Sequence, residues 1–591
     1  MILLLPGSDK PRTTTWLSCA AFIFYAVFAV APAFSSSFAD DSPKNKTKKA
    51  DPKTQRLGID GARHLLDRTV FGGSPDALNE FAQKTRTEAV DHLLSTLQVE
   101  AVTPLPSWSQ QSPAEVRKLR NQDRAAFGKR LRQWQNELRI WWTRELLSSP
   151  SPLTERLVLL WHGHFTSEMQ KVRSPHAMLQ QNILFRTHAA GDYSKLLHAV
   201  ALDPAMILYL DTQKSKKGSP NENFARELFE LFGLGEGHYT EKDIKEAASA
   251  FTGYRINPDT GKARLILRQH DSRRKTVLGR SGNFKAPDIV NSVLSKKASS
   301  EWIAQKFWKE FVSPTPDEKV VSKWATQFRK SKLSIRSLLE TVLLSEAFWS
   351  QEYRGALIKS PVDLVIGSLR RLDMSEVPAG LALRSISRLG QNLFDPPNVA
   401  GWPGGTNWID ATTLLNRRRF ISEQLPTGMI HLIRSQNAKS ENPPKNPANP
   451  DADEESMNPD GVMNPDGMMN PDGVMNPDGV MNPKKDASLP DDTTPDITTP
   501  DITTPDITMA DDAMQKERPQ RLRNREMRRL RPQASARLEQ LFQHFRQLFM
   551  SDTDAWLKWW LPFKPVTDAE HEDTGFGRLK GVLLDPTFQL K

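Results

Sequence analysis

Two histidines and a glutamate lie close together in the sequence, at His162, His164 and Glu168. Imidazole and carboxylate groups are common ligands of divalent metals such as zinc. Side chains two residues apart diverge by about 200° on a helix, so these groups converge only in a turn. A helix predicted to end at Gly163 allows that turn, and with it a metal site in which both histidines are also catalytic. The alternative to a metal site is that both histidines form hydrogen bonds with backbone carbonyl groups at the end of the helix.

A second group of polar residues follows Pro220. On a helix, Asn223, Glu227 and Glu230 share one face, and Arg226 can pair with Glu222 or Glu230. One interpretation is a solvated face of ion pairs. The other is a polar cleft in which Asn223 and Arg226 bind a ligand and Glu227 performs acid–base chemistry or holds a cation.

Two further groups of residues are candidate sites only if the fold places their side chains suitably. His270 and Asp271 are adjacent, beside a predicted strand at residues 263–269, and they are candidate catalytic residues. Trp402 and Trp408 lie in a loop rich in Pro and Gly, where their rings either stack on a sugar or base or fill the core. The chain contains no serine elbow, phosphate-binding loop or zinc-protease signature.

The elements that position these residues are mostly helices. Between residues 57 and 435 apolar residues recur with a period near 3.6, and this predicts a mainly α fold with one small β hairpin. Residues 516–591 add a basic segment and C-terminal helices that complete the same large multi-helix domain.

Low-complexity repeats separate these two parts, at residues 436–515. The repeats are four hexapeptides of the Met-Asn-Pro-Asp-Gly-Val type at 457–480 and three copies of Thr-Thr-Pro-Asp-Ile at 493–507. Isolated turns of this kind bury too little apolar surface to offset chain entropy, so we expect a disordered insertion. The insertion carries −13 while the whole chain carries +10, which leaves +23 on the remainder.

The N-terminus is typical of an export signal. Lys10 and Arg12 precede an apolar run at residues 16–32, and small residues follow near Ala33 and Ala39. We expect a signal peptide at 1–39 and a polar lead-in at 40–56, with export to the periplasm, the cell envelope or the medium. A retained signal anchor is the alternative. Cys19, the single cysteine, lies within the signal.

The basic segment at 516–537 carries nine Lys and Arg against two Glu. It favours an anionic polymer or a membrane surface as partner. The alternative is pairing with the acidic repeats that precede it. No specific nucleic-acid signature is present, and the sequence does not indicate an oligomeric state.

Many separated motifs occur in the order found in one known family. On these motifs the chain resembles the bacterial domain-of-unknown-function family 1800, over residues 57–435 and again at about 536–591. The resemblance supplies no activity, and it implies that the repeats are an insertion within one domain and that the chain is exported. The matching stretches are residues 62–66, 71–72, 152–156, 161–165, 203–206, 221–228, 235–239, 251–253, 275–279, 396–409 and 584–591.

Two functions are consistent with this pattern. The first is an exported enzyme with a polar cleft of His, Glu and Asn side chains, of which a metal-assisted hydrolase is the most concrete form. The second is a non-catalytic protein that binds polysaccharide or assembles the cell envelope, with Trp402 and Trp408 in the contact surface. Convergence of the His and acidic side chains favours the enzyme.

Overall fold

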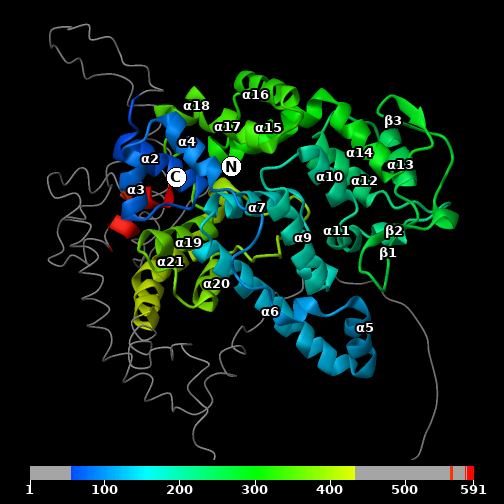
Figure 1. Ribbon diagram of the computed structural model, residues 1–591, viewed down its shortest axis with the longest axis horizontal. Helices are drawn as coiled ribbons and strands as arrows, with labels where there is room; N and C mark the ends of the chain where they lie inside the picture. The colour runs from blue at the N-terminus through cyan, green and yellow to red at the C-terminus, as the bar shows by residue number, and fades with distance from the viewer. Residues whose placement is uncertain (1–54, 433–559, 563–579, 581) are drawn as a thin grey trace, which may run out of the picture. The chain divides into compact units, whose positions relative to one another are not determined.

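The computed structural model describes residues 55–432, 560–562, 580 and 582–591. These residues are mainly helical, with two small antiparallel hairpins, and this confirms the predicted fold class (Figure 1). The helices of the first half are α2 Gly58–Thr69, α3 Pro75–Ala82, α4 Arg86–Ser95, α5 Pro113–Gln122, α6 Arg124–Ser148, α7 Pro152–His164, α8 Met169–Val172, α9 Pro175–Thr187, α10 Tyr193–Ala201, α11 Pro204–Tyr209 and α12 Asn223–Glu227.

The second half continues in the same way. Its helices are α13 Glu241–Ala250, α14 Ala286–Ser295, α15 Lys297–Phe311, α16 Glu318–Lys330, α17 Ile335–Leu343, α18 Glu346–Trp349, α19 Pro361–Arg371, α20 Ala379–Arg388 and α21 Ala411–Arg419. The strands are β1 Tyr254–Ile256, β2 Ala263–Leu265, β3 Lys275–Val277 and β4 Arg280–Gly282. Two π-helical turns, η3 Leu228–Gly233 and η7 Phe420–Gln424, follow directly on α12 and α21.

Polar caps define where many of these helices begin. Thr240 accepts a hydrogen bond from the Asp243 backbone N–H while the Asp243 side chain bonds the Thr240 N–H, and this capping box begins α13. A charged stretch of the chain forms the consecutive helices α5 and α6. Asp123 separates them because its side chain accepts hydrogen bonds from the first backbone N–H groups of α6.

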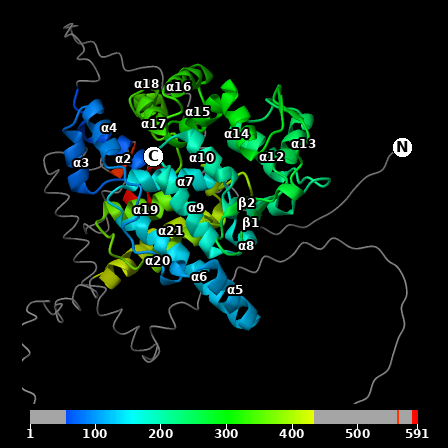
Figure 2. The ribbon, with the colours of Figure 1, turned by 45° about the vertical axis from the view of Figure 1, so that its right-hand side comes forward.

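The core lies around α7, which packs against α9 and α6 in the middle of the described part (Figures 1 and 2). Trp142 of α6, Trp161 of α7 and Phe185 of α9 are fully buried. Burying one large apolar side chain contributes about 1.5–3 kcal/mol, and this apolar contact fixes the positions of the three helices.

The C-terminal residues pack onto the start of α19. The backbones of Leu357 and Lys591 exchange two hydrogen bonds of 3.3 and 2.7 Å, and the Lys591 Nζ lies 2.8 Å from Asp363 Oδ2. Arg156 of α7 also pairs with Asp363. The end of the chain is therefore tied through one buried carboxylate to the central helix.

The two hairpins lie beside α13 and α11. In the first, Tyr254 pairs with Leu265 and Ile256 with Ala263; in the second, Lys275 pairs with Gly282. The predicted strand at 263–269 is shorter than expected, since residues 267–269 form a 3-10 turn. Gly253, at φ 82°, allows the hairpin to approach closely, because a Cβ there would lie 2.9 Å from the His270 backbone nitrogen.

Several sequence predictions fall outside the described residues. These are the signal peptide at 1–39, most of the lead-in at 40–56, the insertion at 436–515 and the basic segment at 516–537. Within the part that the structure describes, no helix has the length and apolar character to cross a membrane.

Candidate functional site

His162 and His164 lie on one continuous helix, so the predicted turn at Gly163 is wrong. α7 runs through Gly163 to His164, and the two side chains diverge. His162 Nε2 accepts a hydrogen bond from Asn182 Nδ2 at 3.1 Å, whereas His164 Nε2 lies 3.0 Å from the Phe232 carbonyl oxygen. Rings of Trp142, Phe185 and Phe394 surround His162.

Both histidines are buried and neutral. Burial, reinforced by the nearby Arg186 charge, lowers the pKa of His162 to about 3. Burial also lowers the pKa of His164 well below its usual value. Among the residues that the structure describes, no three His, Cys, Asp or Glu side chains converge as metal ligands. The metal site predicted from His162, His164 and Glu168 is therefore not formed, because each side chain faces a different neighbour.

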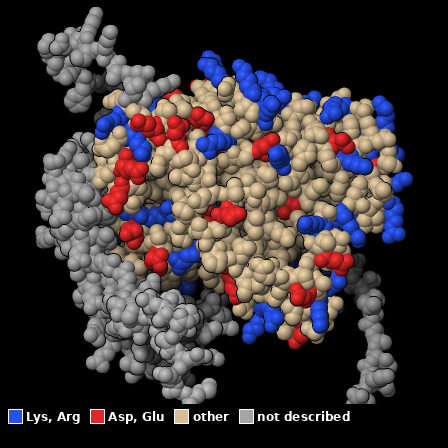
Figure 3. Space-filling view, viewed as in Figure 1, with Lys and Arg blue, Asp and Glu red and all other residues tan. Residues whose placement is uncertain are grey.

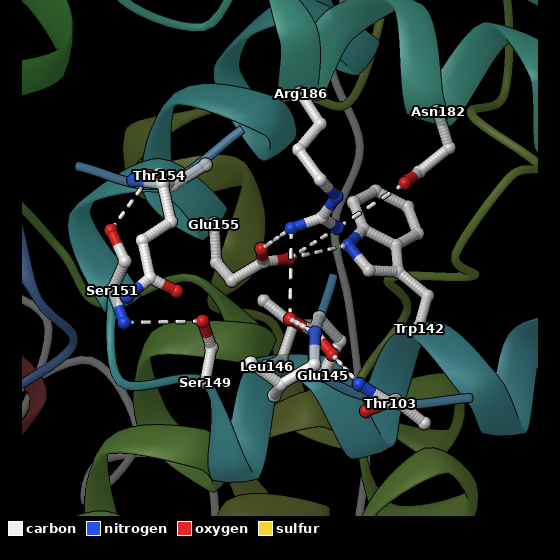
Figure 4. Close-up of polar contacts among 12 residues, drawn as sticks. Thr103, Trp142, Glu145, Leu146, Ser149, Ser151, Thr154, Glu155, Asn182 and Arg186 are labelled. Atoms are coloured by element: carbon white, nitrogen blue, oxygen red, sulfur yellow. Dashed lines mark hydrogen bonds and ion pairs between the residues drawn. The ribbon is translucent and has the colours of Figure 1, made fainter. Parts of the chain in front are cut away.

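A buried network of charges surrounds Arg186 of α9, next to Asn182 (Figure 4). Arg186 pairs with Glu155, and Trp142 donates its indole N–H to the same carboxylate at 3.2 Å. Glu145 accepts hydrogen bonds from two backbone N–H groups, including that of Thr103 at 2.8 Å. Burial raises the pKa of Glu155. Since Glu145, Glu155 and Arg186 are almost inaccessible, this network joins α6, α7 and α9 rather than meeting a substrate.

Sequence reasoning missed this network. Polar residues lie next to both Glu155 and Arg186 in the sequence, so neither charge stands out as a core position. A charged residue at a core position of a helix needs a buried partner of opposite sign.

Glu168 lies apart from the histidines, half-buried at the start of α8. Burial and the neighbouring Asp395 charge raise its pKa. The loop that carries Asp395 lies against α8, since the Met169 N–H donates to the Phe394 carbonyl at 2.9 Å and the Gln170 N–H to Asp395 Oδ1 at 3.1 Å. Glu168 is thus held between α8 and this loop.

Tyr209, at the end of α11, lies between two acidic side chains. Burial, then the charge of Glu168 and then that of Glu227 raise the pKa of Tyr209 to about 12. Lys171 lies 5.0 Å from the centre of the tyrosine ring. The charges of Glu168 and Glu227, two residues that the sequence placed in separate candidates, therefore both act on Tyr209. We call these three residues the Glu168–Tyr209–Glu227 cluster.

Glu227 is half-buried on the last turn of α12, next to the π-helical turn η3. Burial and the Glu230 charge raise its pKa. π-Helical turns interrupt the regular hydrogen-bond ladder and occur frequently at functional sites. Tyr209 was missed from the sequence because it belongs to no motif.

The remaining residues of the second candidate lie on the surface. Arg226 donates hydrogen bonds of 2.7 and 2.9 Å to Glu241 of α13 and one of 3.3 Å to Glu222. Its predicted Glu222 pair is thus confirmed, and Glu241 takes the place expected for Glu230. Asn223 is exposed, and its backbone N–H bonds the Asn221 side chain. The solvated ion-pair interpretation holds for Arg226, while Glu227 faces inward.

A groove adjoins the cluster on the far side of Glu230. It has a volume of about 560 Å³, and it is lined among others by Glu230, Glu301, Glu318, His238 and Trp302. Trp302 donates its indole N–H to the Leu231 carbonyl at 2.8 Å, which fixes the ring in the groove wall. Glu227 itself does not line the groove, so the groove lies beside the cluster and does not contain it.

His270 and Asp271 belong to a separate, structural arrangement. His270 Nδ1 lies 3.0 Å from the Thr252 carbonyl oxygen, and the Asp271 carboxylate bonds the Arg273 guanidinium. The Arg273 hydrogen bond lowers the pKa of Asp271 to about 2. The two side chains do not bond each other, and their contacts hold the segment before β3 in place.

The two tryptophans of the Pro/Gly loop have different environments. Trp408 is buried, as the core-filling interpretation expects. Trp402 is half-exposed, and its indole N–H donates to the Asn392 carbonyl at 3.2 Å. Its ring lies over Gly163, where an added Cβ would be 3.6 Å away. Gly401 packs so closely that a Cβ on it would lie 2.2 Å from the Gly163 carbonyl oxygen.

Comparison with known proteins agrees with the resemblance found in the sequence. A family model described as "Protein of unknown function (DUF1800)" matches residues 64–542. No curated protein and no solved structure matches the chain.

Proposed function

The chain belongs to the DUF1800 family of proteins of unknown function, and we propose that it is an exported hydrolase that cleaves a glycan by acid–base catalysis at Glu168 and Glu227. The observation that carries the proposal is a pair of half-buried carboxyl groups, both with raised pKa values, whose charges both act on one buried tyrosine. Paired carboxyl groups of this kind are the usual catalytic residues of glycosidases.

The raised pKa values give the pair its chemistry. A carboxyl group that keeps its proton near neutral pH acts as the general acid, and an ionised partner acts as the base. Each carboxyl group also has an acidic neighbour of its own, Asp395 for Glu168 and Glu230 for Glu227, and the charge of that neighbour disfavours its ionisation. Tyr209 is buried and keeps its proton at neutral pH, because its pKa is raised to about 12.

A glycan is favoured as substrate by two partly exposed aromatic rings, those of Trp402 and Trp302. Trp402 is half-exposed on the loop that holds Glu168, and Trp302 lines the adjoining groove. Aromatic faces give the apolar face of a sugar ring a large contact at low conformational cost. The expected export signal places the protein where envelope and extracellular glycans are found.

The test uses purified protein and a panel of bacterial and plant glycans, with release of reducing ends as the readout. Substituting Glu168→Gln or Glu227→Gln is expected to lower kcat by about 10²–10⁴-fold, the usual contribution of one acid or base. Glu222→Gln is the matched control, since Glu222 lies on the same segment but pairs with Arg226 at the surface. Unchanged kcat in both cluster variants would overturn the proposal.

A binding protein without catalysis is the second candidate, and Trp402 favours it because part of its ring is accessible to a ligand. Under this alternative, the wild-type protein retains a glycan without releasing reducing ends, and Trp402→Ala lowers the affinity. Under the hydrolase proposal, the same variant raises KM while the wild-type protein releases product.

A further inference from the structure

The loop before α12 and the first hairpin together form a strongly basic surface. We define the basic hairpin surface by six cations on two segments, together with one leucine: Lys216, Lys217, Lys262, Arg264, Arg268, Arg274 and Leu267. The segments are joined by a 2.7 Å hydrogen bond from the Lys217 N–H to the Gln269 carbonyl and by one of 3.1 Å from the Gly253 N–H to the Ser215 carbonyl. Lys and Arg gather along the same edge in Figure 3, at the right of the view.

Nearby acids do not neutralise this surface. Asp259 pairs with Arg117, and Asp271 is buried against Arg273. Among the described residues, no carboxylate forms an ion pair with any of the six cations. In the hairpin register Arg255 lies directly opposite Arg264, an arrangement of like charges that disfavours the isolated hairpin. An anionic partner would relieve this repulsion.

Leu267 indicates what kind of anionic partner fits. It is 70% exposed, more than any other large hydrophobic residue that the structure describes. Arg264 and Arg268 flank it in sequence. An apolar side chain among cations matches a lipid surface, where anionic headgroups cover an apolar layer. A soluble polyanion or an acidic glycan offers nothing for the leucine to contact.

We propose that the basic hairpin surface docks onto an anionic phospholipid bilayer, with Leu267 entering the headgroup layer and the surrounding Lys and Arg contacting lipid phosphates. The proposal is independent of the glycan chemistry, since none of these residues belongs to the Glu168–Tyr209–Glu227 cluster. The surface belongs to the folded domain and is separate from the basic segment at 516–537, for which an anionic polymer, a membrane surface or pairing with the acidic repeats was expected.

The experiment measures co-sedimentation of the full chain with vesicles of phosphatidylglycerol and phosphatidylcholine in equal parts. Arg264→Gln/Arg268→Gln/Arg274→Gln is expected to weaken binding about 100-fold at low salt, or about fivefold for each cation removed. Leu267→Ser is expected to weaken it about tenfold, because an apolar side chain no longer enters the layer. At a salt concentration of about 0.5 M, the triple variant should differ less from wild type in vesicle binding, because salt screens the charges. The difference between Leu267→Ser and wild type should remain.

Matched controls remove equal charge and apolar area elsewhere. Lys129→Gln/Arg130→Gln/Arg132→Gln alters three cations of α6, and Val99→Ser alters another exposed apolar residue, which is 57% exposed. Both controls should bind like wild type. The proposal is overturned if the hairpin variants bind like these controls. It is also overturned if Leu267→Ser changes nothing while the triple variant loses dextran sulfate as strongly as vesicles, since that result identifies a soluble polyanion as partner.

Discussion

Two sets of polar residues lie within a short stretch of this chain, and they differ in exposure. Around His162 and Glu155, every charged group is enclosed and has a partner of opposite sign or a hydrogen bond. Around Tyr209, Glu168 and Glu227 are half-exposed and lie near other acids. The enclosed charges stabilise the fold but cannot reach a substrate. The half-exposed carboxyl groups of the second set, with raised pKa values, can exchange protons with a substrate. The histidine motif that stands out in the sequence is therefore the structural one.

The largest effect on stability is expected from breaking the enclosed set. Glu155→Leu leaves the Arg186 charge buried with only the more distant Glu145, at 3.8 Å, as an acidic partner. Removing one member of a buried ion pair typically costs about 3–5 kcal/mol. We expect the free energy of unfolding in urea to fall by about this amount. The surface variant Glu80→Leu is the control, and a loss below about 1 kcal/mol would show that the network is not what holds α7 to α9.

Asp203 offers a pH-dependent test of how α11 positions Tyr209. Its side chain caps α11 through the Met206 N–H at 2.9 Å and also accepts from Gln181 at 2.8 Å. Burial raises its pKa to about 7. The native state therefore binds more protons than the unfolded state between about pH 4, the usual pKa of Asp, and pH 7. Stability should fall as the pH rises through this window.

Asp203→Asn removes the titrating proton and keeps a good capping residue. Between pH 4 and 7, the free energy of unfolding of the wild-type protein is expected to fall more steeply with pH than that of the variant. The difference between the two slopes is at most about 1.4 kcal/mol per pH unit. Above pH 7 the two curves should run parallel. Parallel curves throughout the window would contradict a buried, protonated Asp203.

The smallest effect is expected at the surface pair between α12 and α13. Arg226 and Glu241 are both largely solvated, so Arg226→Ala should cost only about 0.2–1 kcal/mol. Thermal unfolding at low and high salt checks this value, since salt screens exposed pairs. A larger loss of stability would contradict this interpretation. It would indicate that Arg226 fixes the position of α12, the helix that carries Glu227.

The sequence predicted the helical class well, because apolar periodicity and caps such as the Thr240–Asp243 box act locally. It misplaced the end of α7 because glycine usually breaks helices. Here Gly163 is retained within the helix, where Gly401 and Trp402 pack against it. The electrostatic effect of Glu168 and Glu227 on Tyr209 involves three separate elements, and no local pattern in the sequence records it. Only the two glutamates could be nominated from their residue types.

The central claim is that chemistry belongs to the half-exposed cluster and not to the enclosed histidines. The most direct measurement compares glycan hydrolysis and thermal unfolding for Glu227→Gln and His162→Phe. We predict that Glu227→Gln loses at least about 100-fold in kcat with an unchanged Tm, while His162→Phe lowers Tm and leaves kcat of the folded protein unchanged. Loss of kcat in folded His162→Phe with full activity in Glu227→Gln would contradict the account.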